Sequence, residues 1–494
     1  MLTNDQLDLW DRAHFLHPST AFGQHSRGES PTRIVKRASG VFIEDRDGNR
    51  LLDAFAGLYC VNVGYGRTEI AEAIAAQAHE LSYYHSYVGH GTEASITLAR
   101  MVAERAPAHM NKVYFGLGGS DANETNVKLV WYIQNVLGRP EKRKIISRWR
   151  GYHGSGLITG SMTGLVPFHN KFGLPLPEVV HTEAPYYFRR PDPAMSEADF
   201  TAHCAAELEA LIEREGADTI GAFIGEPLLG TGGIVPPPAG YWDAIQPILK
   251  KHDILLITDE VVTGFGRMGT MMGSDHYGIT PDIITIAKGL TSAYAPLSGS
   301  IVSDDLARIL EEGTDKFGPF GHGWTYSAHP IGAAAGVANL QLIDSLGLVE
   351  NAGETGAYFR RAMADALSDH RFVGDVRGDG MLAAVELQRD PDARVDFDAG
   401  EKVTAQVVAE MVRRGVIARA MPQGEIIGFA PPLCLNRTEA DTIVAARRDG
   451  RDAVTPLFSR GLVGARAARA PGLPDADLTG LTVAALPRRG LQQP

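Results

Sequence analysis

The sequence predicts an α/β protein in which a mostly parallel sheet forms a large domain and a smaller α+β domain follows it. Between about residues 60 and 330, short apolar runs alternate with longer helical patterns, which is typical of a parallel sheet covered by helices. Two of these runs end in an ionisable residue, Asp259 and Lys288. After residue 346, amphipathic helices mix with short strands, which indicates an α+β domain.

The strands expected in the large domain are short apolar runs at 112–115, 144–147, 220–224, 254–258, 283–287 and 298–302. A helix is expected after Ser120, because Val127, Val130, Ile133 and Leu137 recur at close to helical spacing and should pack on the sheet. An alanine-rich helix is expected at about 330–345, where it would link the two domains. Strands of the smaller domain are expected at 382–387 and 426–429.

These elements predict four parts of the chain. Residues 1–60 should contribute to the small domain and the active-site entrance, 61–330 should form the large cofactor-binding domain, and 331–458 should form the linker helix and the small domain. Residues 459–494 are rich in Ala, Arg, Gly and Pro without periodicity, which predicts a flexible tail.

Asp259 and Lys288 are the first candidate site residues. The carboxyl ends of parallel strands form the ligand crevice of a doubly wound sheet, so the two side chains can face each other across one bound molecule. An amine opposite a carboxylate suggests pyridoxal phosphate, which needs a lysine for its Schiff base and an acid for its ring nitrogen. The alternative is a lysine that merely ends a strand and an aspartate that caps a helix.

Residues 116–123 (GLGGSDAN) follow a strand and open a helix, so their backbone amides and the Ser120 hydroxyl form an anion site suited to a phosphate. A dinucleotide site is the alternative, because Gly116 and Gly118 begin the G-x-G-x-x-G pattern. Asp121 stands where the third glycine should be and would repel a pyrophosphate, which disfavours that alternative.

Tyr152 follows the strand at 144–147, where its ring could stack on a pyridine with Val261 on the opposite face. The alternative for Tyr152 is an ordinary core tyrosine.

Composition narrows the class of protein. The chain has 494 residues, 44% hydrophobic and 21% charged, as in ordinary globular enzymes, and its net charge of -12 disfavours a nucleic-acid partner. Three cysteines, Cys60, Cys204 and Cys434, are odd in number and far apart, so neither a disulfide framework nor a metal site is expected. No export signal or membrane span is evident, and a cytoplasmic location fits best.

Taken together, the motifs resemble those of the class III pyridoxal-phosphate aminotransferases of fold type I. The matching stretches lie in the family's order and span nearly the whole chain to about residue 458: 119–124 (GSDANE), 151–154 (GYHG), 225–227 (GEP), 259–269 (DEVVTGFGRMG), 287–290 (AKGL) and 323–330 (GWTYSAHP).

The resemblance implies that Lys288 is the Schiff-base lysine and Asp259 the partner of the ring nitrogen. It also implies a homodimer with shared active sites, because the family donates one residue across the dimer. The remaining implied cofactor residues are Tyr152 and Val261 on the two ring faces, Gly119 and Ser120 at the phosphate, Glu226 as support from a neighbouring strand end, and Thr325 at the phosphate of the other subunit.

Departures from the ornithine and γ-aminobutyrate branch are informative. That branch carries a glutamate and a glutamine at the positions of Thr231 and Val262, so the substitutions disfavour it. Residues 56–66 (AGLYCVNVGYG) resemble instead the ω-amine, β-alanine and taurine:pyruvate branch, with Tyr59 in place of the usual tryptophan. Tyr59, Tyr87 and Thr231 are therefore expected to bind substrate.

Arg419, in the stretch 416–421 (VIARAM), matches the mobile arginine with which this branch binds the carboxylate of a keto acid. The alternative is an exposed arginine at a strand end. His153 and Glu260 lie in motifs, but an indirect or structural role is expected for them.

The resemblance implies transfer of an amino group from an amine or ω-amino acid to a keto acid, with pyruvate as the expected acceptor, by a ping-pong mechanism. One alternative keeps the cofactor and changes the reaction, since aminomutases, racemases and decarboxylases share the fold. A second is an NAD-binding or non-enzymatic protein. The expected partners are small-molecule amines and keto acids, with no nucleic acid and no membrane.

Overall fold

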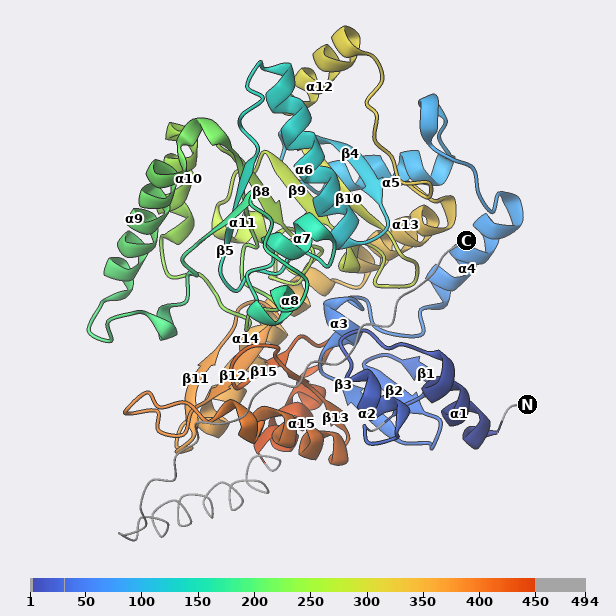
Figure 1. Cartoon of the computed structure of the whole chain (residues 1–494). Helices are drawn as coiled ribbons and strands as arrows, with labels where there is room; N and C mark the ends of the chain where they lie inside the picture. Colours follow the sequence, from blue (N-terminus) through green and yellow to red (C-terminus); the bar gives the residue numbers. More distant parts are fainter. Residues whose placement is uncertain (1–2, 31, 449–494) are drawn as a thin grey trace, which may run out of the picture.

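A computed structural model describes residues 3–30 and 32–448. Its centre is a seven-stranded sheet in which β10 alone runs antiparallel to its neighbours (Figure 1). Every strand predicted for the large domain is present, and β6 is added at one edge. In order across the sheet, the strands are β4 (Met110–Gly116), β10 (Ser298–Ser303), β9 (Ile283–Ile286), β8 (Leu255–Asp259), β7 (Ile220–Gly225), β5 (Lys144–Arg148) and β6 (Val179–Thr182).

Alternating residues of the strands pack against different helices. Ile145 joins a core with α6 (Gly119–Val136), α7 (Leu157–Met162) and α12 (Asp304–Phe317), whereas Ile146 joins a core with α9 (Glu197–Glu215) and α10 (Tyr241–Lys251). This alternation is the two-residue period of a strand. Because both faces are covered, each large apolar side chain buried here stabilises the fold by about 1.5–3 kcal/mol.

Helix α6 begins at the predicted place. Val127, Val130 and Ile133 are buried against the sheet, as the helical spacing predicted. The prediction for Leu137 was wrong, because the helix ends at Val136 and the Leu137 side chain turns outward, 42% exposed.

Two smaller sheets lie beside the central one. One joins both ends of the described chain, since β13 (Val416–Ile417) pairs in parallel with β3 and places Val416 opposite Leu52. The predicted strands at 382–387 and 426–429 are confirmed in the other sheet. The first sheet is β1 (Val35–Ser39), β2 (Phe42–Asp45), β3 (Arg50–Asp53) and β13; the second is β11 (Val373–Arg377), β12 (Ala383–Leu387), β15 (Ile426–Phe429) and β14 (Arg419–Ala420).

The predicted linker helix is α13 (Pro330–Ser345), whose buried face packs on α4 (Thr68–Glu80) and α5 (Glu93–Ala103). Proline at its first turn fits a helix start, because the missing amide has no partner there in any case. The other helices are α1 (Asn4–His14), α2 (Phe22–Ser26), α3 (Ala56–Tyr59), α8 (Val166–His169), α11 (Gly273–Tyr277), α14 (Leu348–Leu367) and α15 (Val403–Arg413).

Among the described helices, none is by itself long and apolar enough to cross a membrane; α13 and α14 pass that test only as a pair bent by 60°. The tail predicted at 459–494 lies outside the described residues.

Candidate active site

Asp259 and Lys288 come from neighbouring parallel strands. Asp259 is the last residue of β8 and lies opposite Thr285 of β9, and Lys288 follows three residues later. Lys288 is half-buried, and its ε-amino group has no hydrogen-bond or ion-pair partner within the described part of the chain. Its φ of 43° is the left-handed conformation that side-chain-bearing residues rarely adopt, a strain found mainly at functional sites.

The Asp259 carboxylate is buried, 3% exposed, and fixed by three donors. Its Oδ2 accepts hydrogen bonds from Asn123 Nδ2 and is paired with His153 Nδ1, both at 2.8 Å. Its Oδ1 accepts one hydrogen bond, from the Val261 amide at 3.1 Å. The charge is thus stabilised on one side, and Oδ1 retains a lone pair for a further donor.

The residues that hold Asp259 are themselves held. Asn123 Nδ2 also donates to the His153 carbonyl at 2.9 Å, and its Oδ1 accepts from Thr285 Oγ1 at 2.7 Å. A Cβ at Gly151 would lie 3.0 Å from His153 Nε2, so the first glycine of GYHG makes room for the ring. His153 thus contacts the Asp259 carboxylate, and its expected indirect role stays a prediction; no role was predicted for Asn123, which contacts the same carboxylate.

The amino terminus of α6 forms an anion site. The amides of Gly119 and Ser120 have no acceptor among the described residues, and the helix's first bond runs from Ala122 to the Gly118 carbonyl. Asp121 does not oppose an anion there, because its carboxylate turns back to accept from the amides of Leu117 at 2.7 Å and Gly118 at 2.5 Å. Free amides at the positive end of a helix suit a phosphate.

Ser120 faces the loop after β5. Its Oγ accepts from the Ser155 amide at 3.1 Å, and the Tyr152 hydroxyl lies 3.2 Å from Ser155 Oγ. A Cβ at Gly154 would lie 2.7 Å from Ser120 Oγ, and its φ of 143° favours glycine, so this residue lets the loop approach the helix start.

Val261 and Glu226 enclose the same space. A Cβ at Gly119 would lie 3.1 Å from Val261 Cγ2, so the helix start and Val261 are neighbours. Glu226 is 2% exposed, and its two oxygens accept from the amides of Tyr152 at 3.0 Å and Gly230 at 2.8 Å. Burial raises the pKa of Glu226, with the Asp259 charge acting in the same direction.

Tyr59 and Arg419 meet beside Phe55. The Phe55 and Tyr59 rings lie 4.4 Å apart, and the Arg419 guanidinium lies 5.5 Å from the Phe55 ring. Tyr59 is 1% exposed, its hydroxyl has no hydrogen-bond partner among the described residues, and burial raises its pKa while the Arg419 charge lowers it. Arg419 is half-buried, so the alternative of a fully exposed strand-end arginine is wrong.

Thr231 is buried, 7% exposed, and follows Gly230 in the turn that Glu226 holds.

Tyr87 and Thr325 lie in a different region. Tyr87 is 42% exposed and, with Gly323 and β4, lines a cavity of about 350 Å³. Thr325 is exposed; its carbonyl accepts from the Tyr83 hydroxyl at 2.5 Å, while its own hydroxyl has no partner in the described ranges. Among the described residues, no hydrogen bond or ring contact joins Tyr87 or Thr325 to Lys288 or Asp259.

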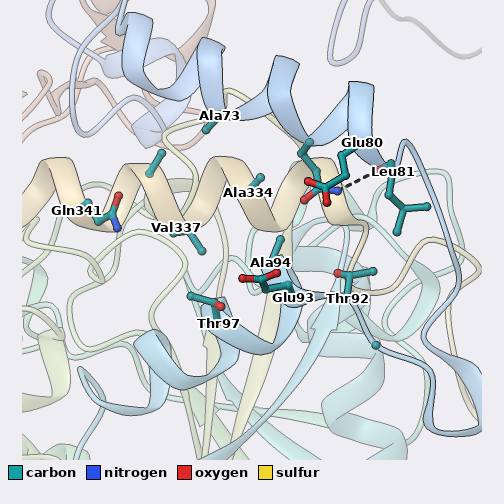
Figure 2. A pocket seen from close by; sticks show the side chains of 13 residues that line it. Ala73, Glu80, Leu81, Thr92, Glu93, Ala94, Thr97, Ala334, Val337 and Gln341 are labelled. Atoms are coloured by element: carbon teal, nitrogen blue, oxygen red, sulfur yellow. Dashed lines mark hydrogen bonds between the residues drawn. The ribbon is translucent and has the colours of Figure 1, made fainter.

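A larger cavity, about 610 Å³, lies between α4, α5 and α13 (Figure 2). Glu80, Glu93 and Thr97 line it, and Gln77 donates to the Leu81 carbonyl at 2.9 Å at its edge. The residues that line this cavity include neither Lys288 nor Asp259 nor the residues around them, so we assign the cavity no part in binding the cofactor.

Comparison with known proteins supplies the family. The model of the class III aminotransferases matches residues 24–447. The chain belongs to this family. A relative from Halomonas elongata, named diaminobutyrate–2-oxoglutarate transaminase, is 55% identical over 93% of this chain and 98% of its own length. A mitochondrial γ-aminobutyrate transaminase of rice is 39% identical over 88% of this chain and 83% of its own length.

Solved structures of transaminases share the fold of this aminotransferase. One from a study of directed evolution by ancestral reconstruction is 57% identical, with a TM-score of 0.91 over 92% of this chain and 99% of its own. The ω-transaminase of Pseudomonas jessenii in complex with PMP is 38% identical, with a TM-score of 0.89 over 91% of this chain and 98% of its own. These matches confirm fold type I, and the cofactor of the family is pyridoxal phosphate.

The residues of this aminotransferase fit that cofactor. The unpartnered Lys288 amine, the free lone pair of Asp259 Oδ1 and the free amides of α6 offer the three kinds of group that an aldehyde, a protonated ring nitrogen and a phosphate require.

Proposed function

We propose that the chain transfers a primary amino group from an amine or ω-amino acid to an α-keto acid, with pyruvate as the acceptor, in a ping-pong cycle. The observation that carries the proposal is that Lys288 and the buried, threefold hydrogen-bonded Asp259 lie at or just beyond the carboxyl ends of adjacent parallel strands. No structural contact explains the Lys288 amine, since it pairs with no group among the described residues.

Each residue has a distinct task in this proposal. Bound pyridoxal phosphate supplies an electrophilic aldehyde and a ring that accepts electrons. Lys288 would hold the aldehyde of the cofactor, and its amine, when free, would carry the proton that the donor carbon gives up. Asp259 would pair with the protonated ring nitrogen, and His153 with Asn123 orients its carboxylate for that role.

The acceptor has a second candidate. The relative from Halomonas elongata carries 2-oxoglutarate in its name at 55% identity, which favours that keto acid. Arg419 beside Phe55 and Tyr59 would pair with the α-carboxylate that both acids share. The same name suggests a diamino acid as donor. Thr231 and Val262 predict that the chain lies outside the ornithine and γ-aminobutyrate branch. The relative named γ-aminobutyrate transaminase argues against that prediction, which stays a prediction.

The test is a matrix of donors and acceptors on the holoenzyme. Apolar amines, β-alanine, γ-aminobutyrate and 2,4-diaminobutyrate would each be paired with pyruvate and with 2-oxoglutarate, and kcat/KM measured. The proposal expects keto-acid-dependent turnover, fastest with pyruvate. A preference for 2-oxoglutarate would replace the acceptor, and turnover without any keto acid would favour the aminomutase, racemase or decarboxylase alternative.

Arg419→Ala should lower kcat/KM for pyruvate far more than kcat/KM for a small aldehyde acceptor, with an apolar amine as the common donor. A carboxylate entering a mostly apolar pocket needs a cation, and losing such a pair costs about 2–5 kcal/mol, whereas an aldehyde brings no charge. The measurement is the ratio of kcat/KM for the two acceptors in wild type and variant. Arg437→Ala serves as control, because Arg437 stacks on Tyr358 away from the site. An unchanged ratio would show that the carboxylate is bound elsewhere.

We further propose that the protein is a homodimer in the cytoplasm, with Thr325 completing the phosphate site of the partner. The exposed Thr325, its unpartnered hydroxyl and the neighbouring exposed Tyr87 and Tyr326 support a surface that a second copy covers. Three free cysteines support a reducing compartment.

Mixing Lys288→Ala and Thr325→Asp subunits should restore activity that neither variant has alone. Thr325→Asp should lower activity at least about tenfold, because its carboxylate would face a phosphate. After subunit exchange, half of the dimers are mixed and each contains one site free of both changes, so about a quarter of wild-type activity should return. No recovery after verified exchange would mean that each site lies within one chain.

A further inference from the structure

A second cluster of side chains that could bind a metal lies outside the cofactor site, in the amino-terminal arm, by which we mean α1, α2 and the segment that joins them. Asp11 is in the last turn of α1, His25 is in α2, and His17 is in the segment that joins the two helices (Figure 1). One ligand atom from each of the three side chains, a carboxylate oxygen and two ring nitrogens, lies within 4.8 Å of the others.

Two atoms of this cluster are buried without a hydrogen bond. His17 Nε2 lies 2.8 Å from Asp11 Oδ1 in a regular hydrogen bond. His25 Nε2 lies 3.1 Å from Asp11 Oδ2, but the geometry does not make a hydrogen bond, and both atoms are without a partner among the described residues. His25 is only 5% exposed. Buried nitrogen and carboxylate atoms directed at each other without a bond leave room for a shared ligand.

The donor set identifies the class of ligand. Two imidazole nitrogens and one carboxylate oxygen suit Zn²⁺, whereas Mg²⁺ and Ca²⁺ prefer oxygen ligands alone. We propose that Asp11, His17 and His25 bind one Zn²⁺ ion per chain, with a water molecule as the fourth ligand. The expectation of no metal site rested on the number and spacing of the three cysteines, and the proposed site uses none of them.

The site would join α1 to α2 across the intervening turn. Among the described residues, the hydrogen bonds that tie α1 to the turn after β2 come from Arg46, which donates to Asp8 Oδ2 at 2.6 Å and to the Asn4 carbonyl at 3.1 Å. Because the arm has few buried residues of its own, a metal crosslink would add to its stability rather than to the chemistry at Lys288.

The test measures Zn²⁺ binding to the holoenzyme after treatment with a chelator, by calorimetric titration, for wild type, His25→Gln and His14→Gln. His14 is exposed on the same helix and is the matched control. Wild type and His14→Gln should bind one Zn²⁺ per chain and unfold at a higher temperature when it is present. His25→Gln should lose affinity at least about tenfold and show no such rise.

Co²⁺ added to the same proteins provides a second readout. A visible spectrum of nitrogen and oxygen ligation should appear in wild type and be lost in His25→Gln. His17→Gln, at a half-exposed position, repeats the test if His25→Gln fails to retain its cofactor. No stoichiometric Zn²⁺ binding, equal affinity in the ligand variants, or a sulfur charge-transfer band would each overturn the proposal. The first would leave a metal-free cluster in which His17 hydrogen-bonds to Asp11, the second would place the metal elsewhere, and the third would place it on cysteine.

Discussion

Lys288→Ala should abolish transamination, lowering kcat on the order of 10⁴-fold or more, while the protein still folds and binds the cofactor. The rate falls because no other described side chain at this strand end offers an amine, either to hold the aldehyde or to move the proton. The fold survives because the Lys288 amine has no hydrogen-bond or ion-pair partner among residues 3–30 and 32–448 that its removal would leave unsatisfied. The free energy of unfolding should therefore change by no more than about 1 kcal/mol.

Covalent trapping checks the assignment directly. Borohydride reduction of the wild-type holoenzyme, followed by mass spectrometry, should find the cofactor on the peptide that contains Lys288. Lys112→Ala is the control, because Lys112 lies on β4 of the same sheet with its side chain 64% exposed, and it should keep full activity. Cofactor attached to another lysine in the wild type would refute the role of Lys288.

The strand ends were predictable because local patterns determine them. Apolar runs such as 283–287 signal buried strands, and parallel strands must end at one edge, so Asp259 and Lys288 could be placed together without coordinates. The strand β6 escaped prediction because its sequence, VVHT, is too short and mixed to stand out from a loop. Boundaries shifted by one or two residues where a run ends in a polar residue, as at Asp259.

The network behind Asp259 could not be predicted. Asn123, His153 and Thr285 come from a helix, a loop and a strand that are far apart in the sequence, and only tertiary packing brings their polar atoms within hydrogen-bond distance. One signal was available. Asn123 and Asn126 lie on the buried face of α6, where an amide needs a partner, so a polar residue at an apolar helix position points to a buried network.

The positions of Tyr87 and Thr325 show a different limit. Their predicted roles rest on family resemblance, and one chain alone leaves both exposed. A residue that completes a neighbour's site has no signature in its own chain beyond an exposed polar or aromatic side chain, which is common on any surface.

Asp259→Asn should lower kcat/KM by about 10²- to 10³-fold for every donor and acceptor. The substitution keeps the shape and removes the charge that holds the proton on the ring nitrogen, and loss of a buried charge-assisted pair costs about 2–5 kcal/mol, where 1.4 kcal/mol is tenfold. The amide cannot replace the carboxylate in either orientation. An NH₂ group in place of Oδ2 would face the Asn123 donor, and one in place of Oδ1 would face the Val261 amide.

That donor conflict also destabilises the protein, so a matched control must separate folding from chemistry. Glu260→Gln provides it, because Glu260 is a fully buried carboxylate one residue along, whose oxygens accept from the Gly273 amide at 2.8 Å and from Ser274 Oγ at 2.6 Å. Both variants should lose about 1–3 kcal/mol of unfolding free energy through unsatisfied buried donors. When turnover is normalised to bound cofactor, the rate of Glu260→Gln should stay within a few-fold of the wild-type rate. The reason is that the Glu260 carboxylate faces the turn after β8 and contacts neither Lys288 nor Asp259. If Asp259→Asn then retained more than about a tenth of wild-type turnover per bound cofactor, its charge would not be what holds the ring proton, and the buried network around Asp259 would be structural alone.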